Sequence, residues 1–148
     1  MNVIVEMYQT AAHSMLLQLV VIAVICDTVF GVLRAVKEKK FNSNFGIDGA
    51  IRKIGMIISL VFMVVADAVI KINLIGFIPA EVRTLLGVET IGVAEFFALL
   101  YIAYEVISII KNMALCGLPV KSIWVKARNW LGKYTDELPA DNTETEIK

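Results

Sequence analysis

The chain has 148 residues, a formal net charge of zero and a hydrophobic content of 58%. Soluble domains contain about 45–50% apolar residues, so this content, with a mean hydropathy of +0.75, indicates that lipid surrounds much of the chain. The balanced charge creates no basic field for nucleic acid, and no nucleic-acid partner is expected.

The side chains that carry most catalytic and metal chemistry are rare. His13 is the only histidine, and the two cysteines, Cys26 and Cys116, belong to no CxxC or Cys/His group. The sequence has no glycine-rich phosphate loop, and no nucleophile has a base at a recognisable spacing. We therefore expect no enzymatic activity, no catalytic residue, no cofactor and no bound metal.

The apolar residues are collected into long blocks. The first basic residue is Arg34, so the N-terminus lacks the basic region of a secretory signal, and the first block is expected to stay in the protein. The blocks cover residues 15–33, 54–70 and 91–110. Each is close to the ~20 residues that a membrane-crossing helix needs. The sequence predicts an all-α integral membrane protein with a transmembrane domain at 1–114 and spans at about 15–35, 53–72 and 91–111.

The basic residues predict the orientation. Residues 1–33 contain no lysine or arginine, and the second loop has only Lys71 and Arg83, whereas most of the others lie in 34–53 and after the third span. Cytoplasmic loops carry the excess of these residues. We expect a multi-pass protein of the bacterial cytoplasmic membrane, with its N-terminus outside and its C-terminus in the cytoplasm.

The connecting segments have recognisable chemistry. Residues 42–49 (NSNFGIDG) are rich in turn formers and are predicted to lie in the first loop. Residues 78–87 (IPAEVRTLLG) are predicted to form a short surface helix that begins near Pro79. Residues 136–148 (DELPADNTETEIK) are polar and acidic, which predicts a disordered tail.

The segment 115–135 is predicted to contain an amphipathic interfacial helix. On a helical wheel from residue 120 to 134, one arc holds Val120, Ile123, Trp124, Ala127, Trp130, Leu131 and Tyr134. The basic residues Lys121, Lys126, Arg128 and Lys133 lie opposite this arc or beside it. Tryptophans and basic side chains suit an anionic cytoplasmic leaflet, so Trp124 and Trp130 are expected anchors. The alternative is packing against the protein's own loops.

Every predicted span contains acidic residues: Asp27, Asp67, Glu95 and Glu105. A charge at the centre of a membrane helix costs roughly 2.5 to 3.5 kcal/mol on insertion scales, so these acids should face protein, water or a partner charge. Lys71 follows Asp67 at i,i+4, which allows neutralisation within one helix. Arg34 is expected to reach towards Asp27 or Glu105.

Each span also has a stripe of small or polar residues, which permits close approach of another helix. The first stripe is Ala23, Asp27, Gly31 and Ala35, and the second is Gly55, Ser59, Met63, Asp67 and Lys71. The third is Ala98, Tyr101, Ile102, Glu105, Ser108 and Asn112. The predicted intramembrane or oligomer contacts are Asp27, Gly31, Ser59, Asp67, Glu95, Glu105, Ser108 and Asn112. The stripes can be satisfied within one bundle or between copies around a wet lumen, and both remain open.

Two ordered motifs extend from the first and third predicted spans into the segments that follow them. The first is CDTVFGVLRAVKEKKFNSNFGIDGAIRKI, residues 26–54, with the positions Asp27, Gly31, Arg34, Lys37, Asn42, Ser43, Gly49, Arg52 and Lys53. The second is YEVISIIKNMALCGLPV, residues 104–120, with the positions Glu105, Ser108, Asn112, Gly117 and Pro119. At these positions the chain resembles the phage lysis and toxin-secretion holins of Gram-positive bacteria and their phages. Tyr104 and Lys111 stand where that family usually has Asn and Glu.

The resemblance implies a holin that oligomerises in the cytoplasmic membrane and forms lesions for an endolysin or a large toxin. The expected partners are further copies of the chain, the anionic cytoplasmic leaflet, and an endolysin or toxin coupled through function. One alternative is a non-pore adaptor or regulatory subunit of a larger membrane complex. The other is a small ion transporter that uses the carboxylates as a proton relay, whereas the lack of internal repeats disfavours a secondary transporter.

Overall fold

The structure, a computed structural model, describes residues 3–39, 43–85, 87–88 and 90–133. The regular structure in these ranges is entirely helical, which confirms the predicted all-α class. The helices are α1 (Val3–His13), α2 (Met15–Glu38), α3 (Ser43–Ile70), α4 (Ala80–Leu85), α5 (Val93–Leu115) and α6 (Lys121–Leu131). The predicted tail at 136–148 lies outside the described residues.

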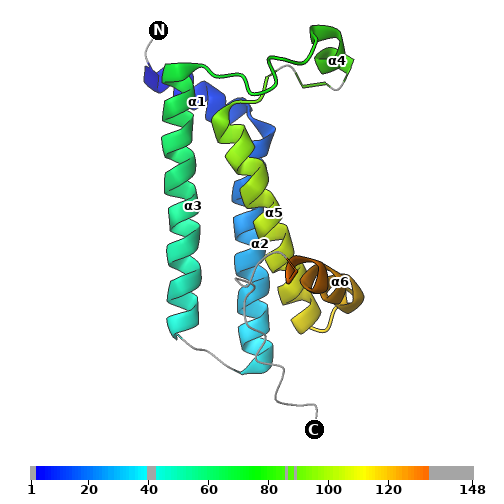
Figure 1. The fold of residues 1–148 in the computed structure, drawn as a ribbon. Coiled ribbons are helices and arrows are strands. Elements are labelled where there is room, and N and C mark those ends of the chain that lie inside the picture. The colour runs from blue at the N-terminus through cyan, green and yellow to red at the C-terminus, as the bar shows by residue number, and fades with distance from the viewer. Residues whose placement is uncertain (1–2, 40–42, 86, 89, 134–148) are drawn as a thin grey trace.

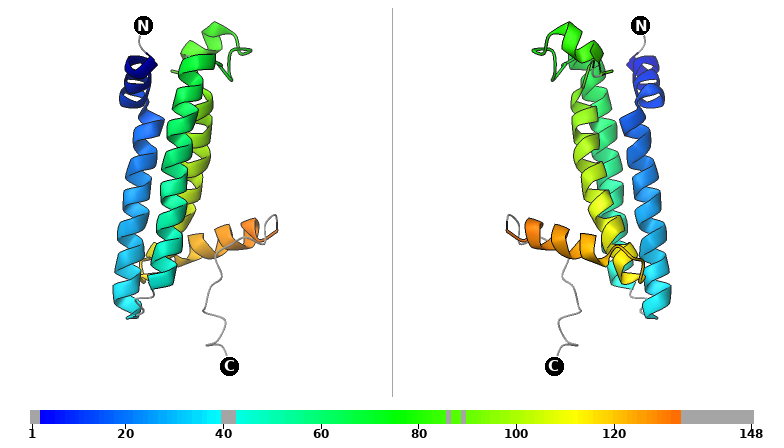
Figure 2. Two further views of the ribbon diagram at one scale, coloured as in Figure 1. Left: turned by 90° about the vertical axis from the view of Figure 1, so that its left-hand side faces the viewer. Right: turned by 90° about the vertical axis from the view of Figure 1, so that its right-hand side faces the viewer.

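Three of the helices, α2, α3 and α5, are long and apolar enough to cross a membrane, as predicted. They lie side by side, with α1 and α4 at one end of the bundle and α6 at the other (Figure 1). We call these the α1 end and the α6 end. Helix α6 lies across the direction of the spans (Figure 2). The predicted short surface helix and the predicted amphipathic helix are therefore both present, as α4 and α6.

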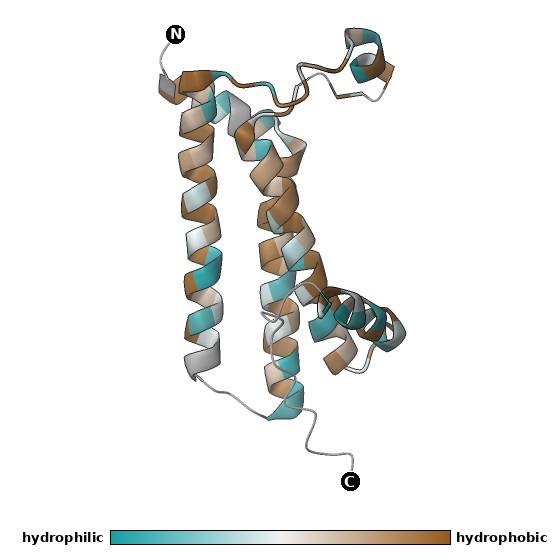
Figure 3. Ribbon diagram, viewed as in Figure 1, coloured by the Kyte–Doolittle hydropathy of each residue, from teal (hydrophilic) through white to brown (hydrophobic). Residues whose placement is uncertain are grey.

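Helix α5 is the central span, because α2 and α3 both pack on it and make little contact with each other. Its Ala94 and Ala98 are fully buried and too small to keep the neighbouring helices apart. The apolar core lies towards the α1 end and consists of Leu17, Val20, Leu60, Val64, Ala94 and Ala98. Many of the other apolar side chains of the spans are exposed on the bundle, and the long helices are coloured hydrophobic along most of their length (Figure 3).

The structure corrects the predicted first loop. Helix α3 begins at Ser43, so most of the segment 42–49 is helical and the connection from α2 is short. Each glycine inside a helix costs about 1 kcal/mol relative to alanine, but the apolar pattern of the span continues through this segment. Ile47, Ile51 and Ile54 repeat at intervals of four and three on the outer surface of α3.

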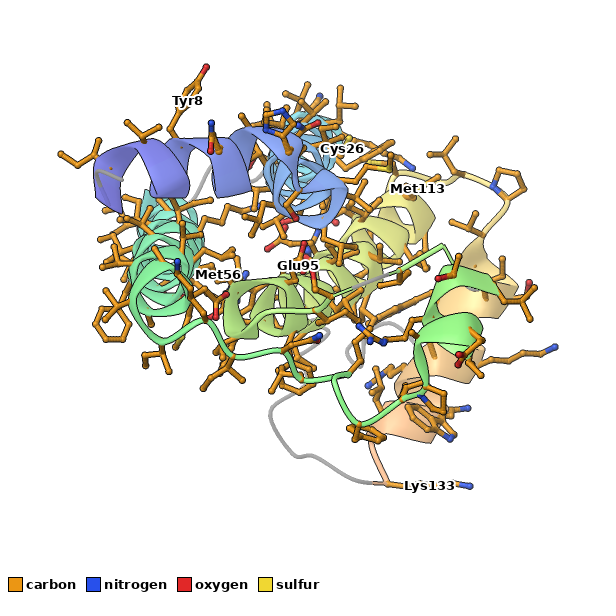
Figure 4. All side chains as sticks on the ribbon, turned by 90° about the horizontal axis from the view of Figure 1, so that it is seen from above. Tyr8, Cys26, Met56, Glu95, Met113 and Lys133 are labelled. Atoms are coloured by element: carbon orange, nitrogen blue, oxygen red, sulfur yellow. The ribbon has the colours of Figure 1, made fainter. Side chains whose placement is uncertain are left out.

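No helix was predicted before residue 15, yet α1 covers residues 3–13. Ser14 has an extended backbone and separates α1 from α2. The Gln18 Nε2 atom donates to the carbonyl of Ala12 at 2.7 Å, which satisfies one of the last acceptors of α1. Helix α1 then crosses the end of the bundle and packs on α3, as the view from above shows (Figure 4).

Candidate functional site: a polar cluster that joins three spans

The three spans meet at four polar side chains, which we call the polar cluster: Asp27 from α2, Lys53 from α3, and Glu105 and Asn112 from α5. The Lys53 Nζ atom lies 2.6 Å from Asp27 Oδ2 and 3.3 Å from Glu105 Oε2. It also donates to the backbone carbonyl of Val24 at 3.3 Å. The Asn112 Nδ2 atom donates to the other carboxylate oxygen of Asp27 at 2.9 Å. One ammonium group therefore connects α2, α3 and α5.

The side chains of the polar cluster are largely buried inside the bundle. Asp27 is 5% exposed and Glu105 is 0% exposed, while the Lys53 side chain is 14% exposed. A charge in such surroundings is tolerated only when it is paired and hydrogen-bonded. Removing one partner of a buried ion pair typically costs about 3–5 kcal/mol, because the other charge is left without compensation. The integrity of this half of the bundle therefore depends on all members of the cluster.

The polar cluster contains two carboxylates but one ammonium group. Both oxygens of Asp27 accept hydrogen bonds, whereas Glu105 accepts only at Oε2 and over the longer distance. Within the described part of the chain, Glu105 Oε1 is the one buried side-chain nitrogen or oxygen atom without a hydrogen-bond partner. Glu105 is thus the less satisfied acid, and the cluster is one donor short.

Helical spacing directs these side chains inwards. The buried residues of α2 recur at intervals of three and four and face α5: Leu17, Val20, Ala23 and Asp27. Gly31 continues this face, and a Cβ atom there would lie 3.8 Å from Asn112 Nδ2, so the two helices approach closely. A second polar contact joins α3 to α5, because Ser59 Oγ and the hydroxyl of Tyr101 are 2.7 Å apart.

At the α1 end, the Asp67 carboxylate binds the first turn of α5. The amides of Val93 and Ala94 donate to its two oxygens at 2.9 and 2.7 Å. A carboxylate here satisfies free helix N–H groups and complements the positive end of the helix dipole. A Cβ atom on Gly92 would lie 2.5 Å from Asp67 Oδ2, so this contact requires glycine. The acid of the second span thus holds the third span in place.

Glu95 serves the same junction. Its Oε2 accepts from the amide of Gly92 at 3.2 Å and its Oε1 from the hydroxyl of Ser14 at 2.8 Å, which links α5 to the start of α2. Glu95 lies near the middle of this end in the view from above (Figure 4). An open pocket of about 410 Å³ lies beside it, lined by His13, Ser14, Asp67, Lys71, Ile72, Asn73, Thr90, Gly92 and Glu95.

At the α6 end, the two tryptophans have different surroundings. Trp124 is 5% exposed and lies against α5, with Lys111 Nζ 6.0 Å from the centre of its ring. Trp130 is 61% exposed. The predicted apolar arc of α6 is therefore divided between a side that packs on α5 and a side that remains open. Lys121, Lys126 and Lys133 are exposed, and Arg128 is half-buried.

The turn from α5 into α6 is closed by a lysine from α2. Lys37 Nζ donates to the carbonyl of Leu115 at 3.3 Å, at the negative end of the α5 dipole. Gly117 has φ +87°, and a Cβ atom there would lie 2.8 Å from Lys37 Nζ. The backbone angle therefore favours glycine at this motif position, whereas the Lys37 ammonium is the end of a flexible side chain that can move aside. Pro119 follows in the same exposed link.

The remaining motif residues are mostly helical, and this corrects their prediction as a loop. Ser43 is the first residue of α3, and Gly49 and Arg52 lie within it; the Arg52 guanidinium stacks 5.1 Å from the ring centre of Tyr104. Arg34 does not reach the acids as expected, because its Nε donates to Glu38 one turn away at 3.0 Å. Two further predicted positions are Ser108, which is half-buried on α5, and Asn42, which lies outside the described residues.

The most important functional residue that the sequence did not reveal is Lys53 as the cation of the polar cluster. Lys53 is predicted to lie at the edge of the second span, at about 53–72, but α3 begins ten residues earlier and carries Lys53 inside the bundle. A usable signal exists, because Lys53, Met56, Leu60 and Val64 follow one another at helical intervals, and the last three are buried. In the described ranges, no three His, Cys, Asp or Glu side chains form a group that could hold a metal ion.

These features define a class: a small multi-pass membrane protein whose three spans are joined at one end by helix-capping acids and further inside by a buried ion cluster. Comparison with known sequences then identifies the family. The profile of the bacteriophage holin family matches residues 5–131, so the chain belongs to that family, and its function is that of a holin in the bacterial cytoplasmic membrane.

The chain is also similar to the holin-like protein TcdE of Clostridioides difficile, with 43% identity over 130 residues. The matched region is 87% of this chain and 78% of that protein. No solved structure matches the chain. The resemblance drawn from the two sequence motifs is therefore confirmed at the level of the family.

Proposed function

We propose that the protein is a non-enzymatic holin that oligomerises with itself and forms lesions through which an endolysin or a large toxin leaves the cell. The observation that carries the proposal is the polar cluster, which places two carboxylates and one lysine inside a bundle of a holin-family chain. Such residues within membrane spans usually mark contacts or water-filled pathways, not lipid-facing surface.

The compactness of the single bundle supports an oligomeric lesion. The space between the spans is filled by aliphatic and alanine side chains at the α1 end and by the polar cluster nearer the α6 end. A folded protein cannot pass through such an interior. A passage must therefore form between copies, and Asp27 and Glu105 can line it only after the polar cluster has opened, since both are buried in the compact state.

We further propose that α1 and α4 lie outside and α6 in the cytoplasm, on the anionic leaflet. The distribution of basic residues supports this orientation. The exposed lysines of α6 and the open side of Trp130 support contact of this helix with the headgroups. Replacing Lys121, Lys126, Arg128 and Lys133 by glutamine should shift the time of lysis at equal protein levels, and unchanged timing would contradict a role of α6 in timing.

The proposed activity is tested by inducible expression in a bacterium together with an endolysin that lacks a signal peptide. We expect an abrupt loss of membrane potential followed by lysis, and loss of potential without lysis when the endolysin carries an inactivating substitution. A size series of tracers released from the cells measures the lesion. Normal growth with confirmed membrane insertion would refute the proposal, as would ion flux without release of proteins.

A further inference from the structure

The segment that precedes α5 forms a lobe with an apolar surface. We call residues 72–85, which include α4, the α4 lobe. Two of its large side chains are among the most exposed in the described part of the chain: Phe77 at 84% and Leu85 at 86%. Val82 is also exposed, one helical turn before Leu85. Such residues are usually buried in a protein that water surrounds.

Hydrogen bonds hold the α4 lobe in a defined conformation. The amide of Leu74 donates to the carbonyl of Ile91 at 2.8 Å, which closes the neck of the lobe. Asn73 Oδ1 accepts from the amides of Ile75 and Ile91 at 3.1 and 3.3 Å. Arg83 Nε donates to the carbonyl of Ile78 at 3.0 Å and fixes the turn before the helix. The exposed apolar side chains are therefore held in place by the fold.

Helix α4 has two unlike faces. Val82 and Leu85, at i and i+3, share one side of the helix, and Thr84 lies on the other side; Glu81 lies between them, one turn before Leu85. This is the pattern of a helix that lies at a boundary between an apolar and an aqueous phase. The α4 lobe thus resembles α6 in pattern, although it is much shorter.

The position of the α4 lobe points to the same boundary. The lobe and α6 overhang the bundle on the same side and at opposite ends, and all views agree on this (Figures 1, 2 and 4). They are attached to the two ends of α5, which has 23 residues and is therefore about 35 Å long, close to the thickness of a bilayer core. Phe96, Leu99 and Leu100 of α5 are exposed, so this span presents apolar side chains outside the bundle.

We propose that the α4 lobe is a second interfacial anchor, which inserts Phe77 and Leu85 into the headgroup and acyl-chain boundary of the leaflet at the α1 end. This inference requires only that the protein spans the membrane and does not depend on whether it forms lesions. With α6 at the other end, the lobe holds α5 at a fixed depth from both membrane surfaces.

The proposal is tested by a single tryptophan placed in the lobe of the full-length protein. The two native tryptophans are replaced in a W124F/W130F background, and F77W is added. The protein is reconstituted in nanodiscs, which leave both membrane faces accessible, with phospholipids brominated near the headgroup. The matched control is T84W, on the polar face of α4. L85W provides a second apolar position in case F77W does not fold.

We expect brominated lipid to quench F77W and L85W at least about twofold more strongly than T84W, and aqueous iodide to show the reverse order. Quenching of F77W by iodide alone would overturn the proposal, because the lobe would then lie in water. Protection of F77W and L85W from both quenchers would also overturn it, in favour of a protein partner that covers the lobe.

Discussion

Replacing Lys53 with methionine removes the ammonium group that joins the three spans while keeping a long, unbranched side chain. The change leaves Asp27 and Glu105 buried without their cation and removes a donor from the carbonyl of Val24. Removal of one partner of a buried pair costs about 3–5 kcal/mol. Total stabilities of about 5–15 kcal/mol are typical, so we expect K53M to lose a large part of its resistance to unfolding.

The assay is unfolding of the purified protein in detergent micelles by increasing dodecyl sulfate, followed by helical circular dichroism. The control is K121M, because Lys121 is an exposed residue of the same type at the start of α6. Exposed substitutions of this kind usually change stability by no more than about 0.5 kcal/mol. K53M should unfold at a clearly lower dodecyl sulfate fraction than K121M.

The reasoning also predicts a rescue. In K53M/D27N/E105Q no charge remains in the polar cluster, and the uncompensated buried charge is what makes the loss of one partner costly, so more than half of the lost stability should return. E105Q alone should cost less than D27N, because Glu105 Oε1 has no partner and Asp27 uses both oxygens. Equal stabilities of K53M and K121M, or a triple variant no more stable than K53M, would refute the account.

Two further predictions concern the ends of the bundle. G92A should lower stability by about 1–3 kcal/mol in the same assay, because the new Cβ meets Asp67 at 2.5 Å. The control G55A lies inside α3 and points into open space, so it should raise stability by up to about 1 kcal/mol, and equal losses in both variants would contradict the fit. W124A should raise amide exchange throughout α6 by at least about tenfold, since loss of a buried tryptophan costs roughly 3 kcal/mol or more. W130A should leave this exchange unchanged. Faster exchange in W130A than in W124A would contradict the assignment of Trp124 to the side of α6 that packs on α5.

The three spans could be predicted from sequence because a run of about twenty apolar residues forms a stable helix in the hydrocarbon core, whatever lies elsewhere in the chain. The amphipathic helix α6 could be predicted for the same reason, because its apolar residues recur at intervals of three and four within one short segment. Which side of α6 packs on α5 is a different matter. Trp124 and Trp130 lie in one arc of the wheel, yet the first is buried and the second is exposed, because only part of α6 packs on α5 and this tertiary contact is not visible in the periodicity.

The partner of Asp27 could not be predicted with the same ease. The segment 42–49 contains residues that favour turns, and the second span is therefore predicted to begin only at about residue 53. Tertiary and membrane context override such local preferences, and α3 begins at Ser43. This moves Lys53 from a loop into the bundle. The role of Asp67 was equally hidden, because it caps a helix that begins 26 residues later in the chain.

The two ends of the bundle are held by chemistry of different kinds. At the α1 end, the Asp67 and Glu95 carboxylates bind backbone amides, and these bonds are fixed by the start of α5. Nearer the α6 end, the spans are joined by ions whose count is unequal. Loss of the Lys53 charge therefore removes the link between the spans at the ionic end and leaves the amide bonds of Asp67 and Glu95 in place. The spans can be expected to separate like a hinge, with the pivot at the capped end and the opening at the ionic one.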